Sequence, residues 1–160
     1  MALEQDLKQL LLGKWEKIVV QGGILNRRSR REAYVLFDIG IYVSQRWVEI
    51  SAVEIEEGAY EVTINVIEKP PIPDSPKYNN PPMQLLKACP SDCQLDKLSF
   101  HGAISLEVSG LYKRGKELLC SSLVIRAGDG SFFEILPSYE FPESIELREI
   151  SVKSVSTLIQ

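Results

Sequence analysis

The stretch from Leu10 to Ile18 constrains the fold of this chain more than any other part of the sequence. Leucines at positions 3, 7, 10 and 11, which lead into this stretch and open it, repeat with the spacing of one face of an α-helix. Gly13 follows, and glycine commonly ends a helix because it adopts the left-handed conformation without Cβ strain. Trp15 and the β-branched run 18–20 come next and favour a strand. The sequence therefore predicts a short N-terminal helix that passes directly into the first strand of a sheet.

Alternation of apolar and polar residues predicts about eight strands in the whole chain. After the first strand, the predicted segments are 33–44, 47–56, 59–68, 98–108, 117–126, 132–136 and 145–155. Gly40 in the middle of one segment indicates a bulge or a sharp bend, as strongly curved sheets require. We therefore expect a mainly β fold with a short N-terminal helix. It is either an antiparallel bent sheet or an eight-stranded barrel.

The tripeptide Gly13-Lys14-Trp15 after a short apolar helix resembles the Gly-x-Trp signature of the lipocalins and the wider calycin superfamily. In that family the tryptophan begins the first strand and closes the narrow end of a β-barrel. The resemblance covers residues 10–18, and beyond them it rests on the all-β pattern. It implies a barrel that encloses a small ligand. It also implies an arginine from a late strand packed on Trp15, and Arg148 is the nearest candidate.

Length and composition suit one β domain over residues 1–160, because the chain has 160 residues and 44% of them are hydrophobic. No run of about 18 apolar residues is present, so the sequence predicts no transmembrane segment. The N-terminal residues also lack the features of a signal peptide, which leads us to expect a cytoplasmic protein. A net charge of −4 argues against nucleic-acid binding by the surface as a whole.

A proline-rich loop interrupts the strand pattern at residues 69–97. Seven of the nine prolines lie between positions 70 and 90, a density that excludes both helix and central strand. The spacing of Pro70, Pro73 and Pro76 matches the P-x-x-P pattern that some protein domains bind. The simpler interpretation is a stiff loop that runs over the surface.

Aromatic residues of the predicted strands are the candidates for lining a ligand cavity. An eight-stranded barrel has room inside for side chains or for one small apolar ligand. The aromatic residues could equally form an ordinary core. The residues that we assign to the predicted interior site are Trp15, Tyr34, Tyr42, Trp47 and Tyr60.

Three cysteines are too few, and an odd number, for a disulfide scaffold, so reduced thiols are the simplest account. A zinc site built from Cys89, Cys93, His101 and Cys120 is a minor alternative. Cys120 lies in an apolar strand, where a free cysteine behaves as a small core residue. A nucleophilic Cys–His pair would need one thiol beside His101, which nothing in the spacing requires. We therefore expect no metal and no cofactor, and we do not favour an enzyme.

Two functional hypotheses follow. The leading one is a non-enzymatic protein that binds a small hydrophobic molecule or chromophore in a calycin-like interior. The alternative is a viral or regulatory interaction module that contacts protein, RNA or anionic lipid, or self-associates. It would use the proline-rich segment and the run 26–31, which contains four arginines. Guanidinium groups hold phosphate or carboxylate in pairs, but such a run is also common in a solvated loop.

Changing Arg27, Arg28, Arg30 and Arg31 together to glutamate tests the alternative. If these residues contact RNA or anionic lipid, binding should be lost while circular dichroism stays unchanged, because so many charges are exposed. Each lost phosphate contact should flatten the log–log salt dependence of binding by about one unit. Unfolding or loss of self-association would instead show that the arginines pair with acidic groups of this protein. Unchanged binding would identify the run as a solvated turn.

Overall fold

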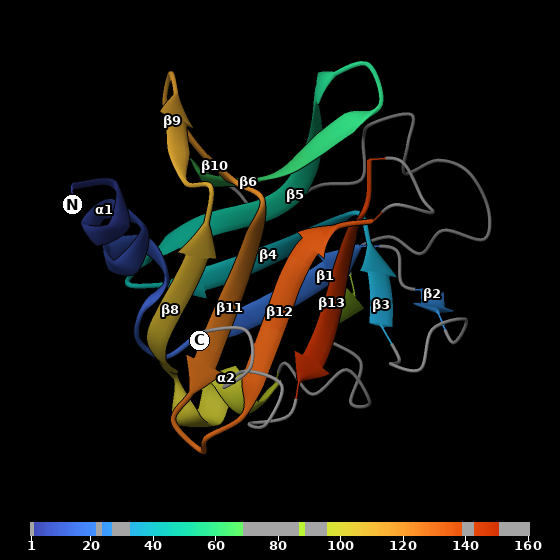
Figure 1. Cartoon of the computed structure of the whole chain (residues 1–160). Helices are drawn as coiled ribbons and strands as arrows, with labels where there is room; N and C mark the ends of the chain where they lie inside the picture. The colour runs from blue at the N-terminus through green and yellow to red at the C-terminus, as the bar shows by residue number, and fades with distance from the viewer. Residues whose placement is uncertain are drawn as a thin grey trace.

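Two antiparallel sheets and two short helices make up the described part of the molecule (Figure 1). The computed structural model describes residues 2–21, 24–26, 33–68, 87–88, 96–138 and 143–150. In spatial order the first sheet contains β7 (Lys87–Ala88), β1 (Lys17–Gln21), β4 (Asp38–Val43), β5 (Arg46–Glu56), β6 (Ala59–Ile67), β10 (Glu117–Cys120) and β9 (Tyr112–Arg114). The second contains β2 (Ile24–Asn26), β3 (Ala33–Leu36), β13 (Ile145–Ile150), β12 (Phe132–Pro137), β11 (Ser122–Ala127) and β8 (Ala103–Ser109). The helices are α1 (Ala2–Leu11) and α2 (Asp96–His101).

This architecture confirms the predicted mainly β fold with a short N-terminal helix. The sheets are bent, but they do not close into an eight-stranded barrel. The predicted hairpin between 47–56 and 59–68 is present as β5 and β6, which pair along almost their whole length. Most of the proline-rich loop 69–97 lies outside the described residues. Within it, β7 adds to the edge of the first sheet beside β1.

The first corner between the sheets lies at Phe37. There the chain leaves the second sheet at the end of β3 and enters the first sheet as β4, so the single strand predicted over 33–44 is wrong. Leu36 and Ile39 both belong to the hydrophobic core, with two residues between them instead of one. Because of this extra residue, the alternation shifts by one position: residues that would otherwise face outward now face the core, as happens at a β-bulge. The bend therefore falls at Phe37 rather than at Gly40, where the sequence predicts it.

Ser121 forms a second corner of the same kind. It separates β10 in the first sheet from β11 in the second, so the strand predicted over 117–126 is also two strands. Cys120 and Leu123 are both in the core and again have two residues between them. The two corners join the sheets by continuous chain and hold their apolar faces toward each other.

Residues 98–101 belong to helix α2, which corrects the strand predicted over 98–108. The N–H of Gly102 donates to the carbonyl of Leu98 at 2.9 Å, and Gly102 has a φ of 72°, in the left-handed region that ends helices. Strand β8 then begins at Ala103. Over so few residues, alternation does not separate a strand from a helical turn, and the alternating pattern gave the wrong element here.

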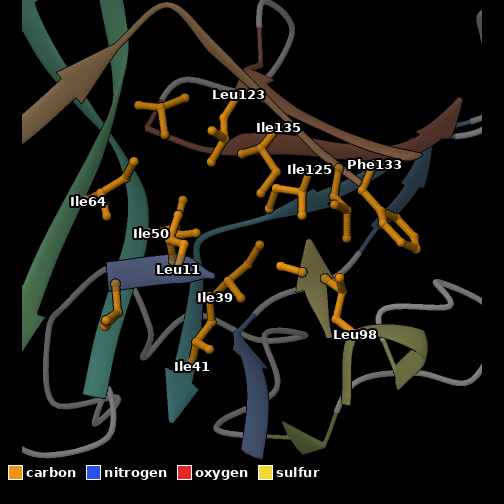
Figure 2. Packing of buried hydrophobic residues seen from close by; sticks show 14 of the residues in the cluster. Leu11, Ile39, Ile41, Ile50, Ile64, Leu98, Leu123, Ile125, Phe133 and Ile135 are labelled. Atoms are coloured by element: carbon orange, nitrogen blue, oxygen red, sulfur yellow. The ribbon is translucent and has the colours of Figure 1, made fainter. Parts of the chain in front are cut away.

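Aliphatic side chains fill the space between the sheets (Figure 2). Side chains from β4, β5 and β6 meet those from β11 and β12, and each helix contributes a leucine. The labelled members are each 0% exposed: Leu11, Ile39, Ile41, Ile50, Ile64, Leu98, Leu123, Ile125, Phe133 and Ile135. Burial of this apolar surface is the main force that holds the sheets together.

The segment between α1 and β1 links three elements that are distant in sequence. Gly13 and Ala103 exchange two backbone hydrogen bonds, Gly13 N to Ala103 O at 3.0 Å and Ala103 N to Gly13 O at 2.8 Å. The backbone N–H of Trp15 donates to Leu98 of α2 at 3.3 Å. The Trp15 side chain is fully buried, and its Nε1–H donates to the carbonyl of Leu11 at 2.9 Å. Trp15 thus fills the core and satisfies one of the free carbonyls at the end of α1.

Trp15→Ala should lower the free energy of unfolding by about 3–5 kcal/mol, because a large aromatic side chain is lost from a packed core. Urea denaturation followed by circular dichroism measures the change. Trp47→Ala provides the matched control, because the other tryptophan is only partly buried, and its loss should cost less. A cost below about 1 kcal/mol for Trp15→Ala would contradict the central role of this residue.

Candidate functional site

The predicted interior aromatic set is spread over different parts of the molecule. Trp15 lies in the core, and only the backbone of Tyr34 is described. Tyr60 is near the β5–β6 turn, where its hydroxyl donates to Oε2 of Glu54 at 2.8 Å in an exposed position. This contact raises the pKa of Tyr60, because the phenol proton is held by the neighbouring carboxylate.

Tyr42 and Trp47 do come together, but on the outer face of the first sheet. They are cross-strand partners with ring centroids 5.4 Å apart and ring planes at 52°. Their neighbours in sequence, Ile41 and Val48, point into the core, so alternation directs the two aromatic rings outward. Lys17 lies over the Tyr42 ring with Nζ 5.9 Å from its centroid. The pair therefore stabilises strand pairing and does not line the space between the sheets.

The remaining predicted site residues are not assembled into a site by the described part of the chain. Arg27, Arg28, Arg30 and Arg31, together with Cys89 and Cys93, lie outside the described residues. His101 is exposed at the end of α2, and Cys120 is buried in β10. Among the residues described, no three histidine, cysteine, aspartate or glutamate side chains are placed to share a metal ion.

Arg148, the candidate partner of Trp15, lies on the outer face of the second sheet. Its neighbour Leu147 points into the core, and Arg148 is directed the other way by alternation. There its Nε lies 2.8 Å from Oε1 of Glu134 on the paired strand. The arginine–tryptophan packing implied by the family resemblance is therefore replaced by a cross-strand ion pair.

A groove of about 470 Å³ lies between α1 and the β9–β10 hairpin. Figure 1 shows both elements on the same side of the molecule, at the left of the view. Four parts of the chain line the groove: α1, the start of β5, the end of β6 and the hairpin. The lining residues are Asp6, Gln9, Leu10, Arg46, Ile64, Asn65, Val66, Lys113, Lys116 and Leu118. A second hollow between α1 and β8 measures about 130 Å³, below the range of about 300–1,000 Å³ that is typical of ligand pockets.

The floor of the groove continues the inner face of the first sheet. Ile64 and Leu118 are cross-strand partners and both belong to the core. Val66 follows two residues along β6 and is 53% exposed. Leu118 pairs with Ile64 of β6 on one side and with Lys113 of β9 on the other. The inner face thus runs from the covered core into the groove, and there it changes from aliphatic to cationic.

The charges around the groove are mainly positive. Arg46, Lys113 and Lys116 are cationic and Asp6 is acidic, whereas the whole protein carries a net charge of −4. Within the described part of the chain, neither lysine forms an ion pair. Arg114 in the same hairpin does, since its Nη2 is 3.2 Å from Oε2 of Glu117. The lysine charges are therefore available to an anion in the groove.

Arg46 connects the sheet to the helix. It follows a tight turn in which Ser44 and Gln45 have φ values of 52° and 64°, and this turn sets the start of β5. Nη2 of Arg46 donates to the carbonyl of Gln9 at 2.9 Å, near the C-terminal end of α1. Nε of Arg46 is buried and has no hydrogen-bond partner among the residues described. Arg46 thus links α1 to the sheet through Nη2, while its Nε–H has no acceptor in the described part of the chain.

Comparisons with models of protein families, with curated proteins and with solved structures find no match to this chain. Among the described residues, no helix combines the length and the apolar character needed to cross a membrane.

Sequence reasoning did not identify this groove. Its residues are scattered from position 6 to position 118, and only the fold brings them together. Lys113 and Lys116 flank Gly115 and have the composition of an ordinary solvated turn. The one usable signal was Val66, an apolar residue at the predicted inward position next to the end of its strand.

Cys120 should be unreactive while the protein is folded. Burial, with a smaller effect from the negative charge of Glu61, raises the pKa of its thiol to about 12. Only the thiolate reacts with iodoacetamide, so at about pH 8.5 native Cys120 should remain unlabelled and should react after unfolding. Peptide mass spectrometry distinguishes it from the other cysteines. Labelling of native Cys120 would contradict its burial.

The same raised pKa predicts a pH dependence of stability. The stabilising effect of keeping the thiol neutral is complete below the pKa of the unfolded thiol. It is lost as the pH rises from there toward about 12, because only the unfolded chain ionises easily. The free energy of unfolding, measured against pH for the unmodified protein and for Cys120→Ala, isolates this contribution, because the variant lacks the titrating thiol.

Proposed function

We propose that this protein is a non-enzymatic binding protein for a small hydrophobic molecule, which it holds in the groove between α1 and the β9–β10 hairpin. The observation that carries the proposal is the groove floor, where the aliphatic inner face of the sheet emerges from the core. Val66 is half exposed there and Leu10 is partly exposed, while Ile64 and Leu118 lie buried at the core end of the floor. The volume of about 470 Å³ falls inside the range of about 300–1,000 Å³ seen for small-molecule sites.

The groove is a better location for this ligand than the space between the sheets. The interior is occupied by close-packed aliphatic side chains, and a ligand placed there would have to displace them (Figure 2). The groove is open, and its wall is a single short helix held at one end by Arg46 and by the Gly13–Ala103 pairing. Binding on the floor would remove the exposed part of Val66 from water, which is favourable.

The chemistry of the lining supports binding rather than catalysis. Among the residues that the structure describes, ten line the groove, and they include no histidine, cysteine, serine or threonine. This described lining therefore lacks the hydroxyl or thiol and the imidazole of a Ser–His or Cys–His pair. Its one carboxylate, Asp6, lies on the exposed face of α1, with no second acid among the described lining residues to act as its acid or base partner.

Val66→Glu tests the proposal with a neutral, environment-sensitive dye such as Nile red as the probe. A charge placed on the apolar floor should weaken dye binding at least about tenfold, equivalent to about 1.4 kcal/mol. Fluorescence titration measures the affinity. The matched control is Ile104→Glu, because Ile104 is also a β-branched strand residue with 53% exposure, but it lies on β8 away from the groove.

The control should bind the dye as the unmodified protein does, and both variants should keep similar melting temperatures. Equal losses in the two variants would assign dye binding to the surface in general. Undiminished binding by folded Val66→Glu would rule out the groove as the site.

A further inference from the structure

We propose that the ligand of this groove is an amphipathic monoanion whose carboxylate head is held by Arg46, with Lys113 and Lys116 at the rim. This inference rests on the proposed function and specifies the chemical class of the ligand. The observation behind it is a change along one continuous surface. The inner face of the first sheet is aliphatic at Ile64 and Leu118 and cationic at its end.

Charge complementarity is the first argument for an anion. Among the described lining residues, three are cationic and one is acidic, although acidic residues outnumber basic ones in the whole chain, 22 to 18. In the described part of the chain, Lys113 and Lys116 have no acidic partner, whereas Arg114 between them in sequence is paired with Glu117. A surface positive charge without a partner is available to an incoming anion and raises its local concentration.

The guanidinium of Arg46 supplies the second argument, because it can hold the ionised oxygens of an anionic head group such as a carboxylate. Arg46 lines the groove and uses Nη2 on the carbonyl of Gln9. Its guanidinium carries further N–H donors, and an ionised oxygen is the strongest acceptor that they can meet. The planar fork of arginine matches the two oxygens of a carboxylate.

The positions of the residues on the sheet set the orientation of the ligand. Ile64 and Leu118 mark the core end of the floor, and Val66 lies two residues further along β6, toward the end where Arg46 begins β5. Lys113 and Lys116 stand on the hairpin side, with Lys113 beside Leu118. An aliphatic chain would lie over Val66 with its head group at Arg46, between α1 and the hairpin lysines. A purely apolar ligand would leave these cations without a partner, so a ligand with an anionic head group is the better fit.

Calorimetric titration of the full chain with decanoate, 1-decanol, decyl phosphate and decylammonium at low salt tests the inference. The four probes share one chain and differ in the head group. Decanoate should bind at least tenfold more tightly than decanol, and decylammonium should bind least well. Added salt should weaken decanoate binding more than decanol binding, because only the former depends on charge.

Three variants locate the head group. Arg46→Gln and the double change Lys113→Gln with Lys116→Gln should each remove most of the preference for decanoate over decanol. Arg114→Gln removes a cation from the same hairpin outside the groove and should leave the preference unchanged. Because Arg46 also contacts α1, decanol binding by Arg46→Gln shows that the groove is intact, and the lysine variant tests the charge without touching the helix.

The outcomes separate this inference from the proposed function. Equal affinities for decanoate and decanol would overturn the carboxylate assignment and leave hydrophobic binding in place. Tighter binding of decyl phosphate would replace the carboxylate with a phosphate. Failure of every probe would overturn both proposals. Binding to vesicles of anionic lipid, without binding of monomeric decanoate, would also overturn the inference and assign the cations to a membrane surface.

Discussion

The backbone pairing between Gly13 and Ala103 is the constraint on which the arrangement of the other elements depends. It fixes the end of α1 against the start of β8 and directs Trp15 into the core. Glycine is favoured on both sides for different reasons: Gly13 has a φ of 109°, which residues with a side chain rarely adopt, whereas a Cβ at Gly102 would lie 3.3 Å from backbone atoms of Gly13. A side chain at either position would strain the backbone or push α1 away from the sheets.

The groove is a consequence of this pairing. With its last turn anchored at Gly13 and at Arg46, α1 lies across the end of the first sheet's inner face but is too short to cover it. Buried leucines on its inner side, Leu7 and Leu11, complete the core, while Leu10 faces the groove. One short amphipathic helix thus closes the core and forms one wall of the candidate binding site.

Alternation and residue chemistry allowed prediction of most of the strand segments, of the first helix and of its glycine end. Three features could not be predicted in this way. Alternation identifies the residues that share a face but not the face that is buried, so Tyr42 and Trp47 could be assigned to the interior although Ile41 and Val48 occupy it. At the corners at Phe37 and Ser121, one extra residue reverses which side chains face the core, and neither position is marked by a glycine or proline. The groove is harder still, because it depends on how α1 and a distant hairpin meet.

The end of α1 also sets a physical limit on the proposed ligand. A helix carries a partial negative charge at its C-terminal end, equivalent to about half an elementary charge, which would repel a carboxylate. Arg46 stands at that end with a full positive charge and donates to the Gln9 carbonyl. The lysines of the hairpin add two more unit charges from the opposite wall. In the described lining, three whole positive charges outweigh half a charge from the helix end and the carboxylate of Asp6, which favours an anion in the groove. Arg46 therefore has two compatible tasks, to neutralise the helix end and to make the adjacent groove able to accept a negative head group.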